Sequence, residues 1–175
     1  MVLDTIISSF WFLLPAGLAN MSPVLFRWLP LFNIPIDLNK TFRGKPIFGK
    51  NKTYRGFIVG TLVAIITIYL EKIFGAVTIV DYNSINIILL GFLLGFGALF
   101  GDLIESFFKR QREKKPGDNW FPFDQTDWIF GALLFAWPLV SYTWEFVIIT
   151  ILLFGLLHPT FNYIGYLLKL RKNKI

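Results

Sequence analysis

Five long runs of apolar residues restrict what this chain can fold into. A helix needs about 20 mostly apolar residues to cross the hydrocarbon core of a bilayer, because each residue adds only ~1.5 Å. Only 16% of the 175 residues are charged, which is less than a water-soluble domain requires. We therefore predict an all-α, polytopic membrane protein, with residues 1–175 as a single transmembrane domain. The five predicted transmembrane helices are Val2–Ala19, Phe57–Phe74, Ile85–Phe108, Trp128–Tyr142 and Phe146–Leu170.

A sixth apolar stretch, Val24–Ile36, is shorter and follows Pro23 directly. Pro30 and Pro35 interrupt it, and proline inside a helix removes a hydrogen bond and clashes with the preceding turn. We expect an interfacial or re-entrant segment here rather than another span.

The distribution of basic residues predicts the orientation. Sixteen of the 17 Lys and Arg residues lie between the first and second runs, between the third and fourth, or at and beyond the end of the fifth. Lys72 is the exception. The positive-inside rule then places the two long loops and the C-terminus in the cytoplasm and the N-terminus outside the cell membrane. An odd number of spans places the two termini on opposite sides of the membrane, so the predicted number of helices agrees with the orientation that the charges predict.

Glycines recur at intervals of four in the third run, as Gly91 and Gly95 and as Gly97 and Gly101. Gly56 and Gly60 open the second run in the same way. Small residues at this spacing let membrane helices approach closely. We expect tight packing within the chain, with a homodimer interface as the alternative.

The composition narrows the chemistry that is available. The chain has no cysteine and a single histidine, His158, so disulfides, cysteine zinc sites and histidine-rich metal sites are excluded. The remaining ligands are oxygen atoms, which favour a hard cation such as Mg²⁺. The aromatic residues lie mostly in apolar runs, which argues against nucleic acid as a partner. His158 and Asn162 are four residues apart and can share a helix face, but the sequence assigns them no role.

Charged residues gather where the third run ends. If that helix continues, Asp102, Glu105, Ser106 and Lys109 share one face, because they are spaced at i, i+3, i+4 and i+7. Asp124 and Asp127 follow at the start of the fourth run. These residues could merely cap a helix or supply positive-inside charge. Together, however, carboxylates and basic groups at a membrane boundary suit a metal ion and a phosphate-bearing substrate.

A second basic cluster, Gly49–Gly56, precedes the second run. Lys52, Thr53 and Arg55 would lie at a helix N-terminus, where free N–H groups favour anions such as a triphosphate. The Walker A order of residues is absent, and anchoring to lipid headgroups explains the charges nearly as well. Asn20, at the inner end of the first run, either terminates that helix or faces the site.

These residues resemble the signature of the CTP-dependent phosphatidate cytidylyltransferases. In its short length the chain is most similar to the archaeal members of that group, the CDP-archaeol synthases. The resemblance covers nearly the whole chain. This chain departs from the bacterial and eukaryotic enzymes at two places. It has Asp118-Asn119-Trp120 where those enzymes have His-Gly-Gly, and Gln125 where they have Arg. The motifs that carry the resemblance most specifically are Gly101-Asp102-x-x-Glu105-Ser106-x-x-Lys109-Arg110, Lys115-Pro116-Gly117-Asp118 and Asp124-Gln125-x-Asp127.

The resemblance implies a Mg²⁺-dependent transfer of a cytidylyl group from CTP to 2,3-bis-O-(geranylgeranyl)glycerol 1-phosphate, with release of pyrophosphate. It implies that Asp102, Asp124 and Asp127 hold the metal and act in catalysis with Lys109. It also implies a set of substrate-binding residues: Asn20, Lys52, Thr53, Arg55, Ser106, Arg110, Lys115 and Asp118.

Three alternatives remain open at this point. The lipid substrate could be an ester-linked phosphatidate, as in a CDP-diacylglycerol synthase. The enzyme could instead be a CTP-dependent polyprenol kinase, which transfers phosphate. A transporter or assembly subunit without catalysis is a third alternative, but it predicts ionisable groups deep in several spans, whereas those of this chain gather at one face.

Overall fold

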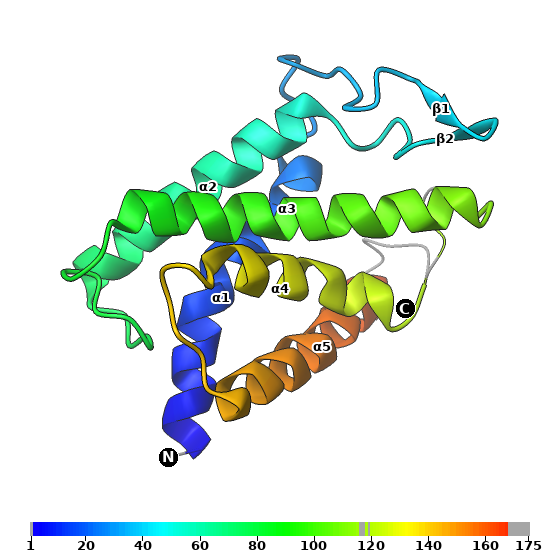
Figure 1. The fold of residues 1–175 in the computed structure, drawn as a ribbon. Coiled ribbons are helices and arrows are strands. Elements are labelled where there is room, and N and C mark those ends of the chain that lie inside the picture. The colour runs from blue at the N-terminus through cyan, green and yellow to red at the C-terminus, as the bar shows by residue number, and fades with distance from the viewer. Residues whose placement is uncertain (1, 116–117, 119, 168–175) are drawn as a thin grey trace.

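The computed structural model describes residues 2–115, 118 and 120–167, except for the side chains of residues 158, 159 and 161–167. Helices make up most of the described chain, and one two-stranded antiparallel hairpin accompanies them (Figure 1). The all-α class and the five predicted helices are thus confirmed. The elements in chain order are α1 (Val2–Leu25), β1 (Thr41–Phe42), β2 (Lys45–Pro46), α2 (Tyr54–Phe74), α3 (Ile87–Gln111), α4 (Phe123–Ala136) and α5 (Trp144–Leu167).

Three of the described helices, α1, α2 and α3, are long and apolar enough to cross a membrane. Helix α4 has 14 residues, and its bounds differ from the predicted Trp128–Tyr142. It begins earlier, at Phe123, and it ends at Ala136, because Pro138 has no amide hydrogen with which to continue the helical hydrogen bonds. In α5 the apolar helix that is described with its side chains covers Trp144–Leu157. Five membrane crossings therefore remain a prediction.

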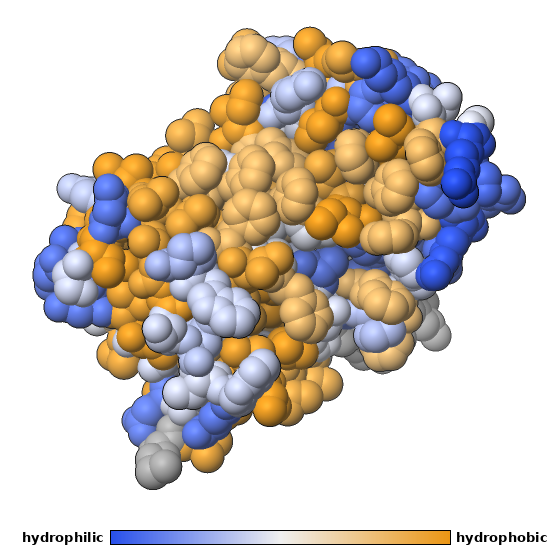
Figure 2. All heavy atoms as spheres, in the orientation of Figure 1, coloured by the Kyte–Doolittle hydropathy of each residue, from blue (hydrophilic) through white to orange (hydrophobic). Residues whose placement is uncertain are grey.

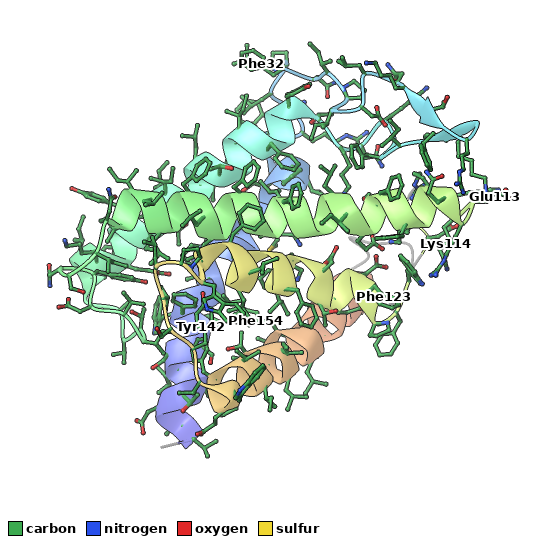
Figure 3. The ribbon with its side chains drawn as sticks, viewed as in Figure 1. Phe32, Glu113, Lys114, Phe123, Tyr142 and Phe154 are labelled. Carbon is green, nitrogen blue, oxygen red and sulfur yellow. The ribbon has the colours of Figure 1, made fainter. Side chains whose placement is uncertain are left out.

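The Val24–Ile36 segment forms no further span. Its first two residues complete α1, which tolerates Pro23 within its last turn. The chain then proceeds through turns, with the amide of Leu29 donating to the carbonyl of Phe26 at 3.1 Å. Trp28, Leu31 and Phe32 are more than half exposed, and Phe32 lies at the outer edge of this loop (Figure 3). Turns with exposed apolar side chains agree with the predicted interfacial segment.

Glycines bring α3 into contact with its neighbours on two sides, as predicted for packing within the chain. A Cβ atom on Gly95 would lie 2.5 Å from the Cβ of Ala64 in α2. On the other side, a Cβ atom on Gly97 would lie 2.5 Å from the carbonyl oxygen of Gly131 in α4. Helix α3 therefore lies between α2 and α4 (Figure 1).

The apolar core lies behind this layer, where α1 crosses α3. Phe12 and Leu13 of α1, Leu94 of α3 and Ile129 of α4 are fully buried there. A buried hydrogen bond of 2.9 Å from the Thr150 hydroxyl to the Ser9 hydroxyl joins α5 to α1. The face of the molecule seen in Figure 2 is mostly apolar, with hydrophilic residues gathered toward its ends. Such a band is what a bilayer would cover.

The loop between α1 and α2 folds back over the end of α3. The amide of Ile36 donates to the carbonyl of Lys52 at 2.8 Å, and that of Tyr54 donates to the carbonyl of Ile34 at 3.0 Å. The hairpin β1–β2 extends from this base, and the Lys45 ammonium donates to the carbonyl of Gln111 at 2.8 Å. The start of α4 reaches the same end of the bundle, where Asp124 of α4 pairs with Lys109 of α3; Figure 3 labels Phe123, Glu113 and Lys114 at this end.

Replacing Gly101 with alanine should destabilise the fold. The added Cβ would overlap the carbonyl oxygen of Asp127, so α3 and α4 would have to separate. Overpacking of this kind costs about 1–3 kcal/mol. We expect a lower midpoint of thermal unfolding in detergent, by roughly 3 °C or more.

Gly155→Ala is the matched control for this substitution. The nearest atom that its Cβ would meet is Cγ2 of Thr126, at 3.9 Å, which is ordinary van der Waals contact. This variant should unfold at the wild-type temperature. An unchanged midpoint for Gly101→Ala would contradict the close approach of the two helices.

Candidate active site

A pocket of about 130 Å³ lies where the α1–α2 loop, the end of α3 and the start of α4 meet. Such a volume suits a phosphate group and a cation, whereas pockets for whole small-molecule ligands usually measure about 300–1,000 Å³. Charged and polar side chains from all three elements line it. The lining residues are Phe48, Gly49, Lys50, Asn51, Lys52, Asp102, Glu105, Ser106, Lys109, Arg110 and Asp124.

Three carboxylates form an acidic cluster at this pocket: Asp102, Glu105 and Asp127, whose closest oxygens all lie within 4.8 Å of one another. Asp102 and Glu105 are one turn apart on α3. Asp127 reaches them from α4, because the glycine contact at Gly101 removes the side chain that would separate the helices.

The acidic cluster can hold a divalent cation. Opposite ligands in a Mg²⁺ octahedron lie about 4.2 Å apart, twice the Mg–O distance, so small movements of the side chains would suffice. Carboxylate oxygens are also the ligands that hard cations prefer.

Two lysines pair with two of these carboxylates, those of Asp102 and Glu105. The Lys52 ammonium, from the loop, is ion-paired with Asp102. Lys109, one turn after Glu105 on α3, lies 3.0 Å from Glu105 and is also paired with Asp124. Burial makes such pairing necessary, since an uncompensated charge in this position would be costly. Lys109 and Glu105 are indeed almost fully buried.

The structure brings together most of the site residues predicted from the sequence. Asp102, Ser106, Lys109 and Arg110 line the pocket from one face of α3, as their spacing predicted. Lys52 and Asp124 line it from the other two elements, and Asp127 belongs to the acidic cluster. Within that cluster, the third carboxylate beside Asp102 and Asp127 is Glu105. Asp124 instead pairs with Lys109 and accepts a hydrogen bond of 2.6 Å from the amide of Trp120.

Thr53 and Arg55 already have partners within the protein. The Thr53 hydroxyl caps the N-terminus of α2 and accepts a hydrogen bond of 3.2 Å from the amide of Gly56. The buried Arg55 guanidinium donates to the carbonyls of Arg27 and Leu29, at 3.0 and 2.6 Å. Both residues thereby hold the loop against the ends of α1 and α2.

The other predicted residues lie outside the pocket lining. Asn20 is half-buried in α1. Lys115 and Asp118 are exposed in the loop before α4, where the Asp118 carboxylate accepts a hydrogen bond of 2.7 Å from the amide of Lys115. The side chains of His158 and Asn162 are outside the described part of the chain.

Asp37 is a site-shaping residue to which the sequence analysis assigned no role. Its carboxylate is buried and accepts hydrogen bonds of 2.9 Å from three backbone amides, those of Asn39, Phe48 and Gly49. Phe48 and Gly49 line the pocket, so Asp37 fixes the wall that faces α3. Gly49 has φ +93°, a conformation that favours glycine, and its backbone lies against Arg110. An aspartate two residues after a proline was too weak a local signal to predict a partner 11 residues away.

The hydrogen bonds also set the charge of Asp37. Burial raises the pKa of its carboxyl, but the amides of Phe48, Gly49 and Asn39 outweigh this effect, so the pKa lies below its usual 3.8. A group whose pKa is lowered on folding stabilises the folded state above its unfolded pKa. That contribution is present at neutral pH and is lost as the pH falls through the lowered pKa.

The chain is similar to known proteins over nearly its whole length. Residues 2–174 match a family described as CarS-like, CDP-archaeol synthase. The CDP-archaeol synthase of Pyrococcus furiosus is 36% identical over 169 residues, which cover 94% of this chain and 95% of that protein. The CDP-archaeol synthase of Archaeoglobus fulgidus is 36% identical over 182 residues, which cover 98% of each.

One solved structure has the same fold. It is described as an intramembrane enzyme for archaeal membrane lipids biosynthesis, and it aligns with a TM-score of 0.76 at 24% identity. The alignment covers 90% of this chain and 94% of that one.

Replacing Asp37 with asparagine should loosen the pocket wall. The amide side chain cannot accept all three backbone hydrogen bonds, and hydrogen bonds to a charged group contribute about 1.5–3 kcal/mol. We expect the amides of Phe48 and Gly49 to exchange with deuterium at least about tenfold faster at neutral pH, as measured by mass spectrometry.

Asp81→Asn provides the matched control. Asp81 makes the same local turn, since its carboxylate accepts a hydrogen bond of 2.9 Å from the amide of Asn83, but it lies in the α2–α3 loop away from the pocket. Its replacement should leave exchange at Phe48 and Gly49 unchanged. Equal exchange in the wild type and Asp37→Asn would show that Asp37 does not hold this wall.

Proposed function

The chain belongs to the CDP-archaeol synthase family, and on that basis we propose that it transfers a cytidylyl group from CTP to an isoprenoid glycerol phosphate in the membrane. The products would be a CDP-linked ether lipid and pyrophosphate, in the biosynthesis of archaeal phospholipids. The observation that carries the proposal is the pocket at one end of an apolar bundle, in which carboxylates and lysines lie side by side. Such a site can receive a metal ion and phosphates while the chains of a lipid stay in the bilayer.

The proposed reaction joins two anions. A phosphate oxygen of the lipid attacks the α-phosphorus of CTP in line with the bond to the leaving pyrophosphate. The attacking oxygen is already ionised at neutral pH, so no strong general base is required. The protein has to neutralise charge, align the two phosphates and stabilise the charge that develops on pyrophosphate.

Basic side chains of the pocket suit this task. Lys52 comes from the α1–α2 loop and Lys109 from α3, and we propose that they contact phosphate oxygens together with the Ser106 hydroxyl and Arg110. The Nε atom of Arg110 is buried, and no hydrogen-bond partner lies within reach in the described part of the chain, so it remains free to meet an anion. Thr53 and Arg55 would act indirectly, by holding the loop. Asn20, Lys115 and Asp118 remain proposed substrate contacts through their place in the family's motifs.

We propose Mg²⁺ as the cation. Asp102 and Asp127 would hold it, with Glu105 or Asp124 as a further ligand; the acidic cluster favours Glu105 because of its position. When bound, Mg²⁺ would supply charge stabilisation at the phosphates. The protein's own part is to hold the carboxylates at fixed positions on two tightly packed helices.

We further propose that the pocket faces the cytoplasm of a multi-pass protein in the cell membrane. The loops at the pocket's end of the bundle carry most of the basic residues, which supports the positive-inside orientation. CTP and Mg²⁺ are available on that side. The exposed apolar residues of the 26–34 segment, including Trp28 and Phe32, would lie in the membrane interface beside the pocket, where a lipid phosphate could approach it.

The central experiment tests both the reaction and the lipid class. Purified protein in detergent or liposomes is given Mg²⁺ and labelled CTP with an unsaturated ether-lipid phosphate or, separately, with a diacyl phosphatidate. We expect a CDP-lipid and pyrophosphate from the ether lipid. In a third reaction with CTP and a polyprenol, formation of lipid phosphate and CDP would indicate a kinase instead. No CDP-lipid from either phosphate would refute the proposal, and equal use of both would remove the ether-lipid assignment.

Substitution of the proposed metal ligands should abolish most of the activity. Asp127→Asn keeps the side-chain volume but removes a charge that the transition state needs, and so does Asp124→Asn. We expect turnover to fall by at least about 100-fold in each, by analogy with the loss of a single electrostatic contact in other active sites. Initial rates of CDP-lipid formation measure this.

Glu113→Gln is the control for the loss of a carboxylate. Glu113 is exposed and pairs with Lys45 at 2.9 Å, outside the pocket. Surface pairs of this kind contribute little, so activity should stay near the wild-type rate. Near wild-type turnover in Asp127→Asn would mean that Asp127 is not part of the catalytic site.

A further inference from the structure

We propose that Lys52 and Lys109 are exchangeable counter-ions, which couple the binding of the cation to the binding of the triphosphate. Each lysine pairs with a carboxylate of the pocket and also lines the space where phosphates would lie. The two lysines would leave the carboxylates for phosphate oxygens when the cation takes their place. This inference rests on the proposed function of the site, because that function supplies the triphosphate.

Competition for the same oxygens is the first step. A cation held by Asp102, Glu105 and Asp127 would share Asp102 with the Lys52 ammonium and Glu105 with that of Lys109. Two positive groups at such short range repel each other by several times the thermal energy, even with partial solvent screening. The cation alone should therefore bind weakly, since it must displace the ammonium groups without offering them a new partner.

The triphosphate relieves this competition. It provides oxygens that can receive both ammonium groups, and its own negative charge is repelled by the carboxylates unless the cation neutralises them. Each ligand should thus strengthen the binding of the other by the same factor, as thermodynamic linkage requires.

Lysine side chains suit the exchange better than the neighbouring arginine. A lysine carries a compact charge on a flexible stem of four carbons. The side chains of Lys52 and Asp102 are still 22% and 25% exposed, so the ammonium has space to move. Arg110, by contrast, is held in place, because it donates to the carbonyl of Lys115 and lies against Gly49.

The test is a titration with Mn²⁺ as the probe, followed by its paramagnetic resonance signal, without lipid and without turnover. In the absence of nucleotide, Lys52→Met should bind Mn²⁺ about tenfold tighter than the wild type, because Asp102 is no longer neutralised. CTP should tighten Mn²⁺ binding to the wild type by about tenfold or more, after allowance for the Mn²⁺–CTP complex in solution. In Lys52→Met this enhancement should fall to about threefold or less.

Lys45→Met is the matched control. Lys45 belongs to the same loop and also forms an ion pair, with Glu113, but it does not line the pocket. Its replacement should leave both Mn²⁺ affinities at the wild-type values. Lys52→Gln serves as a second variant, so that a folding defect of Lys52→Met, visible by size-exclusion chromatography, does not decide the result.

If both Lys52 variants bound Mn²⁺ without nucleotide as weakly as the wild type, or more weakly, the coupling would be overturned. An unchanged enhancement by CTP would overturn it as well. Neither result depends on catalysis, so failure of the coupling is distinct from failure of the proposed reaction, which would appear as absent CDP-lipid.

Discussion

The close contact between α3 and α4 is the constraint on which the rest of the site depends. Gly97 and Gly101 of α3 meet Gly131 and the Asp127 carbonyl of α4 with no side chain between them. In a membrane, where lipid tails are as apolar as leucine, such packing of small residues is a main source of helix association. Here it also brings Asp127 within reach of Asp102 and Glu105. One set of glycines thus contributes to both the fold and the acidic cluster.

Charge at the end of the bundle imposes a second requirement. Four carboxylates, those of Asp102, Glu105, Asp124 and Asp127, gather in a region with limited access to water, and two lysines pair with the first three. Lys109 is supplied by the same helix, whereas Lys52 comes from a loop and depends on that loop's shape. The loop is in turn fixed by Asp37, Thr53 and Arg55, whose hydrogen bonds all end on backbone groups. These three residues link the backbone of the α1–α2 loop to the electrostatics of the pocket.

Local periodicity explains how far prediction from the sequence could go. The face shared by Asp102, Glu105, Ser106 and Lys109 follows from helix geometry, and the structure places all four around one pocket. The spacing of the glycines likewise predicted close packing within the chain. The bounds of α4 were harder to predict, because the apolar run continues past Ala136 and the proline two residues later decides where the helix ends.

The sequence by itself determined the membrane class of the protein, the kinds of side chain available to its candidate site and the helix face that carries most of those side chains. These properties depend on composition and on contacts between residues a few positions apart. Only the tertiary structure decided that Glu105 rather than Asp124 completes the acidic cluster, that Asp37 shapes the pocket wall, and that Thr53 and Arg55 bind backbone groups. Those outcomes depend on distances between separate helices and loops. The packing of side chains sets these distances, and a local sequence pattern does not predict them.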